Sequence, residues 1–176
     1  MSLQNTQIRC THCDFEGALA HRSIKLIYEL SEADWISTSY VHGWCHHCDK
    51  ISNIEPEIDV AYTRQRIEVL LKKMRSLRYV VRRLLGRVFR VRDDEGEELA
   101  TLTLVLKMAS IRKSARRCLA CGLESVEPLD IGESGTFVHK CGGKLFNIPT
   151  AASAARFSYR KEEIYLDVEG HVKRYG

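Results

Sequence analysis

The sequence lacks the apolar runs that would mark a membrane protein. No segment approaches the roughly 18 consecutive apolar residues that a membrane-spanning helix requires. The first residues also contain neither the basic nor the apolar stretch of a secretory signal. We therefore expect a cytoplasmic protein that does not bind a membrane.

Motifs of the common enzyme classes are missing as well. The sequence has no glycine-rich phosphate loop, dinucleotide-binding fingerprint, nucleophile elbow or HExxH motif. No cysteine or histidine is followed two residues later by glutamate, which is the spacing that gives zinc deaminases their proton shuttle. These absences favour a non-enzymatic protein.

The cysteines are the most informative residues that are present. Their odd number, seven, argues against complete disulfide pairing, and CxxC pairs in an intracellular chain more often bind metal. Cys10 and Cys13 form one such pair, and Cys45 and Cys48 form the next one along the chain. Four thiolates suit the tetrahedral coordination of Zn²⁺, so we predict that these four residues share one zinc ion.

A second set lies in the last third of the chain. Cys118 and Cys121 form another CxxC pair, and His139 and Cys141 follow it as a His-x-Cys pair. Three ligands are clear, and His139 is the nearest donor for the fourth position, with His171 as its competitor. The sequence therefore predicts a second zinc ion bound by Cys118, Cys121, His139 and Cys141. An open position filled by water would instead make this second site a zinc-dependent hydrolase.

The layout of both sets resembles zinc-ribbon modules, in which two knuckles meet around one metal. Glycines follow Cys121 and Cys141, where they permit tight turns. The resemblance implies an α+β protein with two small β modules flanking a helical hairpin. The expected parts are residues 5–58, 60–116 and 117–176. Three further histidines lie beside the ligands and remain alternatives to a cysteine: His12, His46 and His47.

The middle part is basic and has helical periodicity. Residues 60–92 contain 11 basic residues and one acidic residue. Their apolar side chains repeat at alternating steps of three and four, forming a heptad seam over residues 67–88. The face opposite the seam would carry Lys72, Lys73, Arg75, Arg78, Arg82, Arg83 and Arg87. Such a face is expected to bind nucleic acid or an acidic protein surface.

Two further elements are expected after this helix. Residues 95–116 predict a second, antiparallel helix, although the alternation of threonine and leucine from Thr101 to Leu106 is also typical of a strand. Residues 163–175 predict a hairpin around Gly170, which we expect to extend the sheet of the second cysteine module.

Together these patterns predict a non-enzymatic protein with two zinc ions that acts as a nucleic-acid-binding or assembly module in an intracellular complex. The alternative is a protein–protein adaptor that associates, or self-associates, through the 67–88 seam. Salt-dependent binding to nucleic acid would favour the first prediction, and salt-insensitive association would favour the second.

Overall fold

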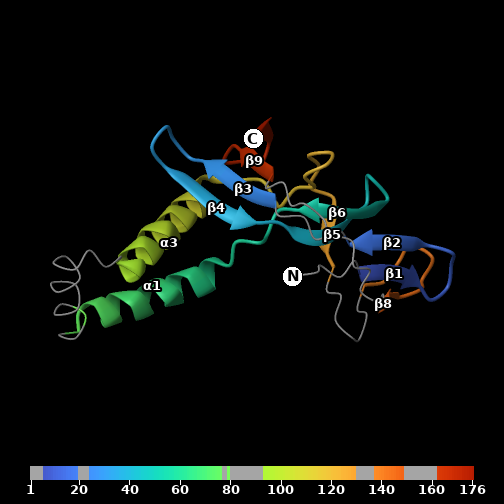
Figure 1. Ribbon diagram of the computed structural model, residues 1–176, viewed down its shortest axis with the longest axis horizontal. Helices are drawn as coiled ribbons and strands as arrows, with labels where there is room; N and C mark the ends of the chain where they lie inside the picture. Colours follow the sequence, from blue (N-terminus) through green and yellow to red (C-terminus); the bar gives the residue numbers. More distant parts are fainter. Residues whose placement is uncertain (1–5, 20–23, 77–78, 80–92, 130–136, 149–161) are drawn as a thin grey trace, which may run out of the picture.

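The computed structural model describes residues 6–19, 24–76, 79, 93–129, 137–148 and 162–176. Within these residues the chain forms helices and several small sheets, which confirms the predicted α+β class (Figure 1). The helices are α1 (Val60–Met74) and α3 (Asp94–Ile111). The strands are β1 (Thr6–Cys10), β2 (Glu16–Leu19), β3 (Ile24–Glu29), β4 (Trp35–Ser39), β5 (Val41–Cys45), β6 (Lys50–Ile54), β7 (Val126–Pro128), β8 (Leu145–Ile148), β9 (Glu162–Leu166) and β10 (Val172–Tyr175).

Each sheet of the described residues joins strands from opposite ends of the chain. The strand orders are β2-β1-β8, β10-β9-β3-β4 and β6-β5-β7. In every case, strands that end at or before Ile54 pair with at least one strand that begins at or after Val126. The cysteine-containing turns at the strand ends therefore meet partners that are distant in the sequence.

The four-stranded sheet is packed on one face against α3. Strand β3 pairs with β9 in parallel, with Leu26 opposite Ile164 and Tyr28 opposite Leu166. These side chains are buried with Met108 of α3 in one core cluster. Leu26 and Tyr28 of β3 and their partners Ile164 and Leu166 of β9 lie on one face of the sheet, because side chains of one parity along a strand share a face.

The predicted C-terminal hairpin forms, but it joins a different sheet from the one expected. Strands β9 and β10 are antiparallel, and Gly170 in their connection has a φ of +82°. The expectation that this hairpin extends the sheet of the second cysteine module was wrong, because β9 pairs with β3. Glycine is required at this turn, since a Cβ atom on Gly170 would lie 2.5 Å from Glu55 Oε1.

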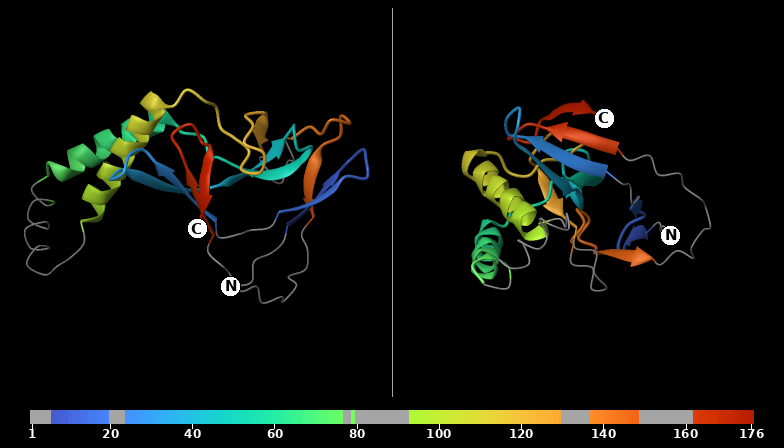
Figure 2. Two further views of the ribbon diagram at one scale, coloured as in Figure 1. Left: turned by 90° about the horizontal axis from the view of Figure 1, so that it is seen from above. Right: turned by 60° about the vertical axis from the view of Figure 1, so that its left-hand side comes forward.

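Helices α1 and α3 lie side by side and antiparallel, as the sequence predicts (Figures 1 and 2). Ion pairs link Arg66 to Glu98 and Lys73 to Glu95. The later residue of α1 thus pairs with the earlier residue of α3, as expected for antiparallel helices. Leu70 is 2% exposed, so the seam packs within the chain at this point. The described part of the seam comprises Ile67, Leu70 and Met74, and its continuation at positions 77–88 lies outside the described residues.

The segment from Thr101 to Leu106 is helical, which decides between the two predicted structures. Alternating threonines fit a helix here because their hydroxyl groups donate to carbonyl oxygens one turn earlier. Thr101 Oγ1 lies 3.0 Å from the carbonyl oxygen of Glu97, and Thr103 Oγ1 lies 2.8 Å from that of Leu99.

No helix among the described residues is long and apolar enough to cross a membrane.

A buried carboxylate anchors the connection that follows α3. Glu55 is fully buried and accepts hydrogen bonds from Tyr28 Oη at 2.7 Å and from both terminal nitrogens of Arg112 at 3.0 and 2.7 Å. The backbone amide of Arg117 donates to the same carboxylate at 2.7 Å. These bonds fix the backbone immediately before Cys118.

Candidate metal centres

The eight predicted ligand residues gather into two groups of four, but the grouping differs from the one expected. The inner tetrad contains Cys45, Cys48, Cys118 and Cys121, and the outer tetrad contains Cys10, Cys13, His139 and Cys141. Within each tetrad the ligand atoms all lie within 4.8 Å of one another. The prediction that Cys10 and Cys13 share an ion with Cys45 and Cys48 was therefore wrong, as was the prediction that Cys118 and Cys121 share one with His139 and Cys141.

Strand pairing between the two ends of the chain explains this nested arrangement. Strand β1 pairs with β8, with Cys10 opposite Leu145, and this brings the first knuckle to the segment that contains His139 and Cys141. Strand β5 pairs with β7, with Cys45 opposite Val126. The second knuckle is thereby placed beside the one that precedes β7. Each half of a tetrad comes from one short segment of the sequence, and strand pairing determines which other half it meets.

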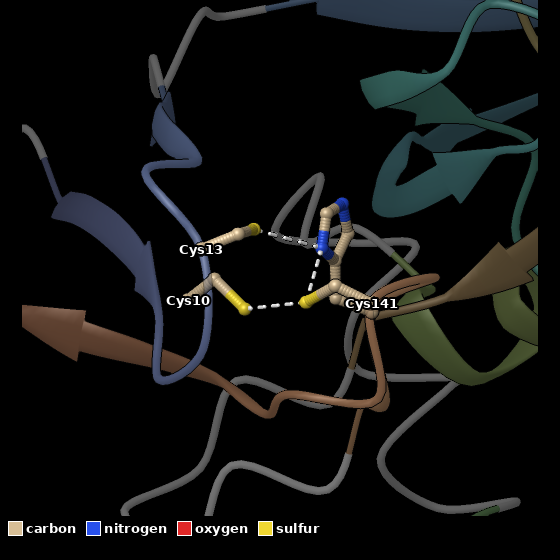
Figure 3. A group of neighbouring side chains, drawn as sticks. Cys10, Cys13 and Cys141 are labelled. Carbon is tan, nitrogen blue, oxygen red and sulfur yellow. Dashed lines mark hydrogen bonds between the residues drawn. The ribbon is translucent and has the colours of Figure 1, made fainter.

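The outer tetrad is a compact set of three sulfurs and one imidazole nitrogen. The sulfurs of Cys10 and Cys141 lie 3.3 Å apart. His139 Nδ1 lies 3.4 Å from the sulfur of Cys13 and 3.3 Å from that of Cys141. Figure 3 shows the three cysteine side chains pointing toward a common centre. The arrangement offers four soft or borderline ligands to one metal ion.

Two glycines shape the loop that carries the last ligand of the outer tetrad. Gly142 has a φ of +80°, a conformation that other residues adopt at a cost, and its amide donates to the carbonyl oxygen of His139 at 2.8 Å. A Cβ atom on Gly143 would lie 2.6 Å from the sulfur of Cys10 and 2.9 Å from the amide nitrogen of His12. Glycine at position 143 therefore allows the two knuckles to approach each other.

Aromatic rings enclose the histidine ligand. The imidazole of His139, whose residue is 4% exposed, has its ring centroid 5.0 Å from that of Phe15 and 5.2 Å from that of Trp44. Trp44 also contacts Phe137, and both are buried in a second core cluster with Ile8, Leu19 and Leu145, against which Phe15 packs. The outer tetrad is thus built against a hydrophobic core on its histidine side, whereas Cys141 is exposed.

The inner tetrad consists of four cysteines at two tight turns. Cys45 is fully buried and Cys118 is 1% exposed, whereas Cys48 and Cys121 are half-buried. The sulfurs of Cys45 and Cys121 lie 3.6 Å apart, and the amide of Cys48 donates to the sulfur of Cys45 at 3.4 Å. Amide-to-sulfur hydrogen bonds of this kind stabilise thiolates.

Both inner turns place a residue with positive φ directly after their second cysteine. Asp49 has a φ of +51° and Gly122 one of +74°. Gly142 does the same after Cys141 in the outer tetrad. Three of the four knuckles therefore share one backbone geometry, of which the glycines were visible in the sequence and Asp49 was not.

The pKa values of the inner cysteines diverge because their sulfurs are crowded together. Burial and the neighbouring sulfurs of Cys121 and Cys45 raise the pKa of the Cys48 thiol to about 12. Burial also acts on Cys118, but hydrogen bonds from the amides of Cys121 and Ala120 outweigh it and lower the pKa of that thiol. Four thiolates this close repel one another, so a bound cation is needed for all of them to be ionised together.

The other histidines considered as ligands lie outside both tetrads. His12 Nδ1 lies 2.9 Å from Thr11 Oγ1, His46 Nε2 lies 3.7 Å from Glu127 Oε2, and His171 Nδ1 lies 3.1 Å from Asp167 Oδ2. His47 belongs to neither group. Among the described residues, His139 is therefore the histidine that can complete a tetrad.

The predicted basic face is described only in part. Lys72 and Arg75 are exposed, whereas Lys73 pairs with Glu95. Arg64 was not singled out from the sequence, yet it is exposed and lies on the same side of α1 as Lys72 and Arg75, because a helix turns about 100° per residue. Four of the predicted cations fall outside the described residues: Arg78, Arg82, Arg83 and Arg87.

No protein-family model matches this chain, and neither a curated protein nor a solved structure matches it. Its function is therefore inferred from the geometry of the tetrads and from the charge on α1.

Proposed function

We propose that the chain is a structural zinc protein that binds one Zn²⁺ ion in each tetrad. The observation that carries this proposal is that eight predicted ligand residues form two sets whose ligand atoms all lie within 4.8 Å. Sets of four cysteines, or of three cysteines and one histidine, are typical of structural zinc sites. The turns with positive φ after the second ligand support a ribbon-like knuckle at three of the four half-sites.

Each tetrad supplies four protein ligands, and this favours a structural role over hydrolysis. Catalytic zinc sites keep one coordination position for water, whereas closed sites use four protein ligands. The zinc ions would then contribute to folding directly, because each tetrad joins segments that are distant in the sequence and the strands beside them are short.

Elemental analysis of the purified protein tests the zinc assignment. We expect two zinc ions per chain and less than about one tenth of that amount of iron. A set of four cysteines also suits iron, so iron in place of zinc would contradict the identity of the metal and leave the tetrads intact. A chain without bound metal, after purification without chelators, would contradict the proposal itself.

We further propose that α1 binds nucleic acid. The side of α1 away from α3 carries Arg64, Lys72 and Arg75, which form no ion pair with another described residue. Lys73 and Arg66, on the other side, are paired with glutamates of α3. The helix thus separates cations used within the fold from cations available to phosphates, and residues 60–92 carry 11 basic residues against one acidic residue.

Charge reversal on α1 tests the nucleic-acid proposal. In fluorescence anisotropy with a labelled duplex and a labelled single strand, Lys72→Glu and Arg75→Glu should weaken binding at least about tenfold and lower the salt slope by about one unit each. Lys50→Glu, an exposed lysine on β6, is the matched control and should leave binding nearly unchanged. Equal losses in all three variants would contradict a role of this face.

The adaptor alternative rests on the apolar side chains of the same helical pair. Leu70 of the predicted seam is buried, whereas Tyr62 and Val69 are 62% and 47% exposed. Concentration-dependent self-association that persists at high salt and is lost in Val69→Glu would support this alternative. The basic face remains the better-supported interaction surface because its three cations, Arg64, Lys72 and Arg75, outnumber Glu68, the acidic residue on the same side of the helix.

A further inference from the structure

The two tetrads are connected through one strand and one side chain. Trp44 and Cys45 are consecutive residues at the end of β5, and Cys45 belongs to the inner tetrad. The indole of Trp44 lies against the imidazole of His139 in the outer tetrad, with ring centroids 5.2 Å apart and an interplanar angle of 78°. Trp44 is 3% exposed, so this contact lies within the core.

The orientation of His139 depends on this contact. A metal-binding histidine usually donates its other ring nitrogen to a carboxylate or a carbonyl oxygen, which fixes the ring. Among the described residues, the hydrogen bonds of the His139 ring all involve Nδ1, the nitrogen that faces the sulfurs. Phe15 and Trp44 pack against the ring, and this packing fixes its orientation where a polar partner would otherwise do so.

The position of Trp44 is fixed in turn by the inner tetrad. The knuckle of Cys45 and Cys48 forms the turn between β5 and β6, and the amide of His46 donates to the carbonyl oxygen of Ser125 at 2.9 Å. An ion that joins Cys45 to Cys121 would hold β5 against β7 and so fix the position of the Trp44 indole. Metal binding to the inner tetrad would therefore position one of the side chains that surround His139 of the outer tetrad.

Chain entropy acts in the same direction. The two halves of the outer tetrad are separated by the whole segment between Cys13 and His139. When the inner tetrad is closed, the path between them shortens to the segment 14–44 before Cys45 and the segment 122–138 after Cys121. Because loop-closure entropy rises with the logarithm of loop length, this shortening favours closure of the outer tetrad by about fourfold.

We propose that metal binding to the two tetrads is coupled, with the inner tetrad filling first and Trp44 acting as the positioning residue through which the inner ion raises the affinity of the outer tetrad. This inference rests on the proposed binding of two metal ions. Coupling between two sites is typically about 5- to 150-fold, and we assign about tenfold to the Trp44 contact. Together with the factor of about four from the shortened loop, the zinc affinity of the outer tetrad should rise roughly 40-fold.

The order of filling follows from the different settings of the ligands. The inner tetrad has four thiolates, two of them on residues that are at most 1% exposed, whereas the outer tetrad includes one histidine and the exposed Cys141. Coupling is reciprocal, so the outer ion also raises the inner affinity by the same factor. The inner tetrad keeps its ion when the outer one is empty because its own affinity is higher.

Zinc competition with a chromophoric chelator tests this coupling in the full chain. Two matched variants each remove one CxxC knuckle: Cys45→Ser/Cys48→Ser for the inner tetrad and Cys10→Ser/Cys13→Ser for the outer. The inner variant should bind zinc at the outer tetrad roughly 40-fold more weakly than the wild type. The outer variant should still bind one ion. An outer affinity within about twofold of wild type in the inner variant would overturn the coupling.

A substitution that retains every ligand separates coupling from misfolding. Trp44→Leu should weaken the second zinc-binding step about tenfold and leave the first step nearly unchanged. Leu166→Ala, in the other core cluster, is the control: it destabilises the fold but should keep the ratio of the two affinities. A wild-type chain that binds fewer than two ions would contradict the proposed function, whereas two ions that bind independently would contradict only the coupling.

Discussion

The inner and outer tetrads have almost the same ligands but very different surroundings. The inner one lies between backbone turns that the buried Glu55–Arg112 pair holds in place, and two of its cysteines are almost completely buried. The outer one rests on aromatic rings at His139 and is open at Cys141. Backbone amides donate to cysteine sulfurs in both tetrads, but a buried ion pair supports the inner tetrad and aromatic packing supports the outer one. From two similar ligand sets in such different surroundings we expect two different metal affinities.

Removing one ligand residue from each tetrad should give the largest difference between the two sites. Cys118→Ser should abolish the inner ion and lower the Tm by more than about 10 °C, because that knuckle also positions the edge of β6 through the Ile54–Cys118 bridge. His139→Ala should remove only the outer ion and lower the Tm by about 5–10 °C. Zinc content and circular dichroism during heating measure both effects. A larger loss of structure in His139→Ala would reverse the assigned roles.

The ionic support of the inner tetrad should give the next largest effect. Arg112→Met leaves the buried carboxylate of Glu55 without its cation, and breaking a buried pair in this way costs about 3–5 kcal/mol. Arg116→Met is the matched control, because Arg116 pairs with the exposed Glu57 and should contribute less than about 1 kcal/mol. Urea unfolding of the zinc-bound protein compares the two. Similar values would contradict a special role for Glu55.

Glycine substitutions should then distinguish two effects: the close approach of the two outer knuckles at Gly143 and the positive φ of Gly122 and Gly142. Gly143→Ala places a methyl group against the sulfur of Cys10 and should weaken outer zinc binding at least about tenfold. Gly122→Ala and Gly142→Ala introduce strain at positive φ but no contact within 4 Å, so each should cost only about 1 kcal/mol. Chelator competition and Tm report the two kinds of loss. Equal effects at all three positions would show that the approach of the knuckles is not limiting.

The smallest effect should come from a charge near the inner tetrad. Amides of Ser114 and Lys113 donate to the Glu169 carboxylate and lower its pKa. A lowered pKa stabilises the fold above the unfolded value of about 4.3 and loses this effect as the pH falls through the folded pKa. Glu169→Gln should therefore lower the Tm by a few degrees at pH 7, a pH at which the cysteine ligands can still hold their ions. A Tm equal to that of the wild type would exclude a contribution of this charge.

The sequence was sufficient to name all eight residues of the two tetrads but not to group them. Cysteine and histidine indicate metal binding by their chemistry, whereas the partner of each CxxC pair is chosen by short strands such as Val126–Pro128 and Leu145–Ile148. Such strands carry no signal that distinguishes one partner from another. A local ribbon was the natural expectation, and long-range pairing of β1 with β8 overrode it.

Other parts of the fold show the same division between local and distant information. The segment Thr101–Leu106 was ambiguous in the sequence because its alternation is typical of a strand. In the structure it belongs to α3, whose first turn is capped by Asp93, which accepts a hydrogen bond from the amide of Gly96. The C-terminal hairpin was visible from Gly170, but its pairing with β3 was not. Glu55 and Trp44 have no distinguishing pattern in the sequence, since their roles arise only from what surrounds them.

The nested order of the knuckles also has a consequence for synthesis on the ribosome. The chain emerges from its N-terminus, so the ligands of the inner tetrad are all available once Cys121 has left the exit tunnel, and β7 follows at Pro128. The ligands of the outer tetrad are complete only after Cys141, and the parallel partner of β3 follows later, at Leu166. Translation thus presents the sites in the order in which they are proposed to fill, and a nascent chain can begin to fold around its first ion while the rest is still being made.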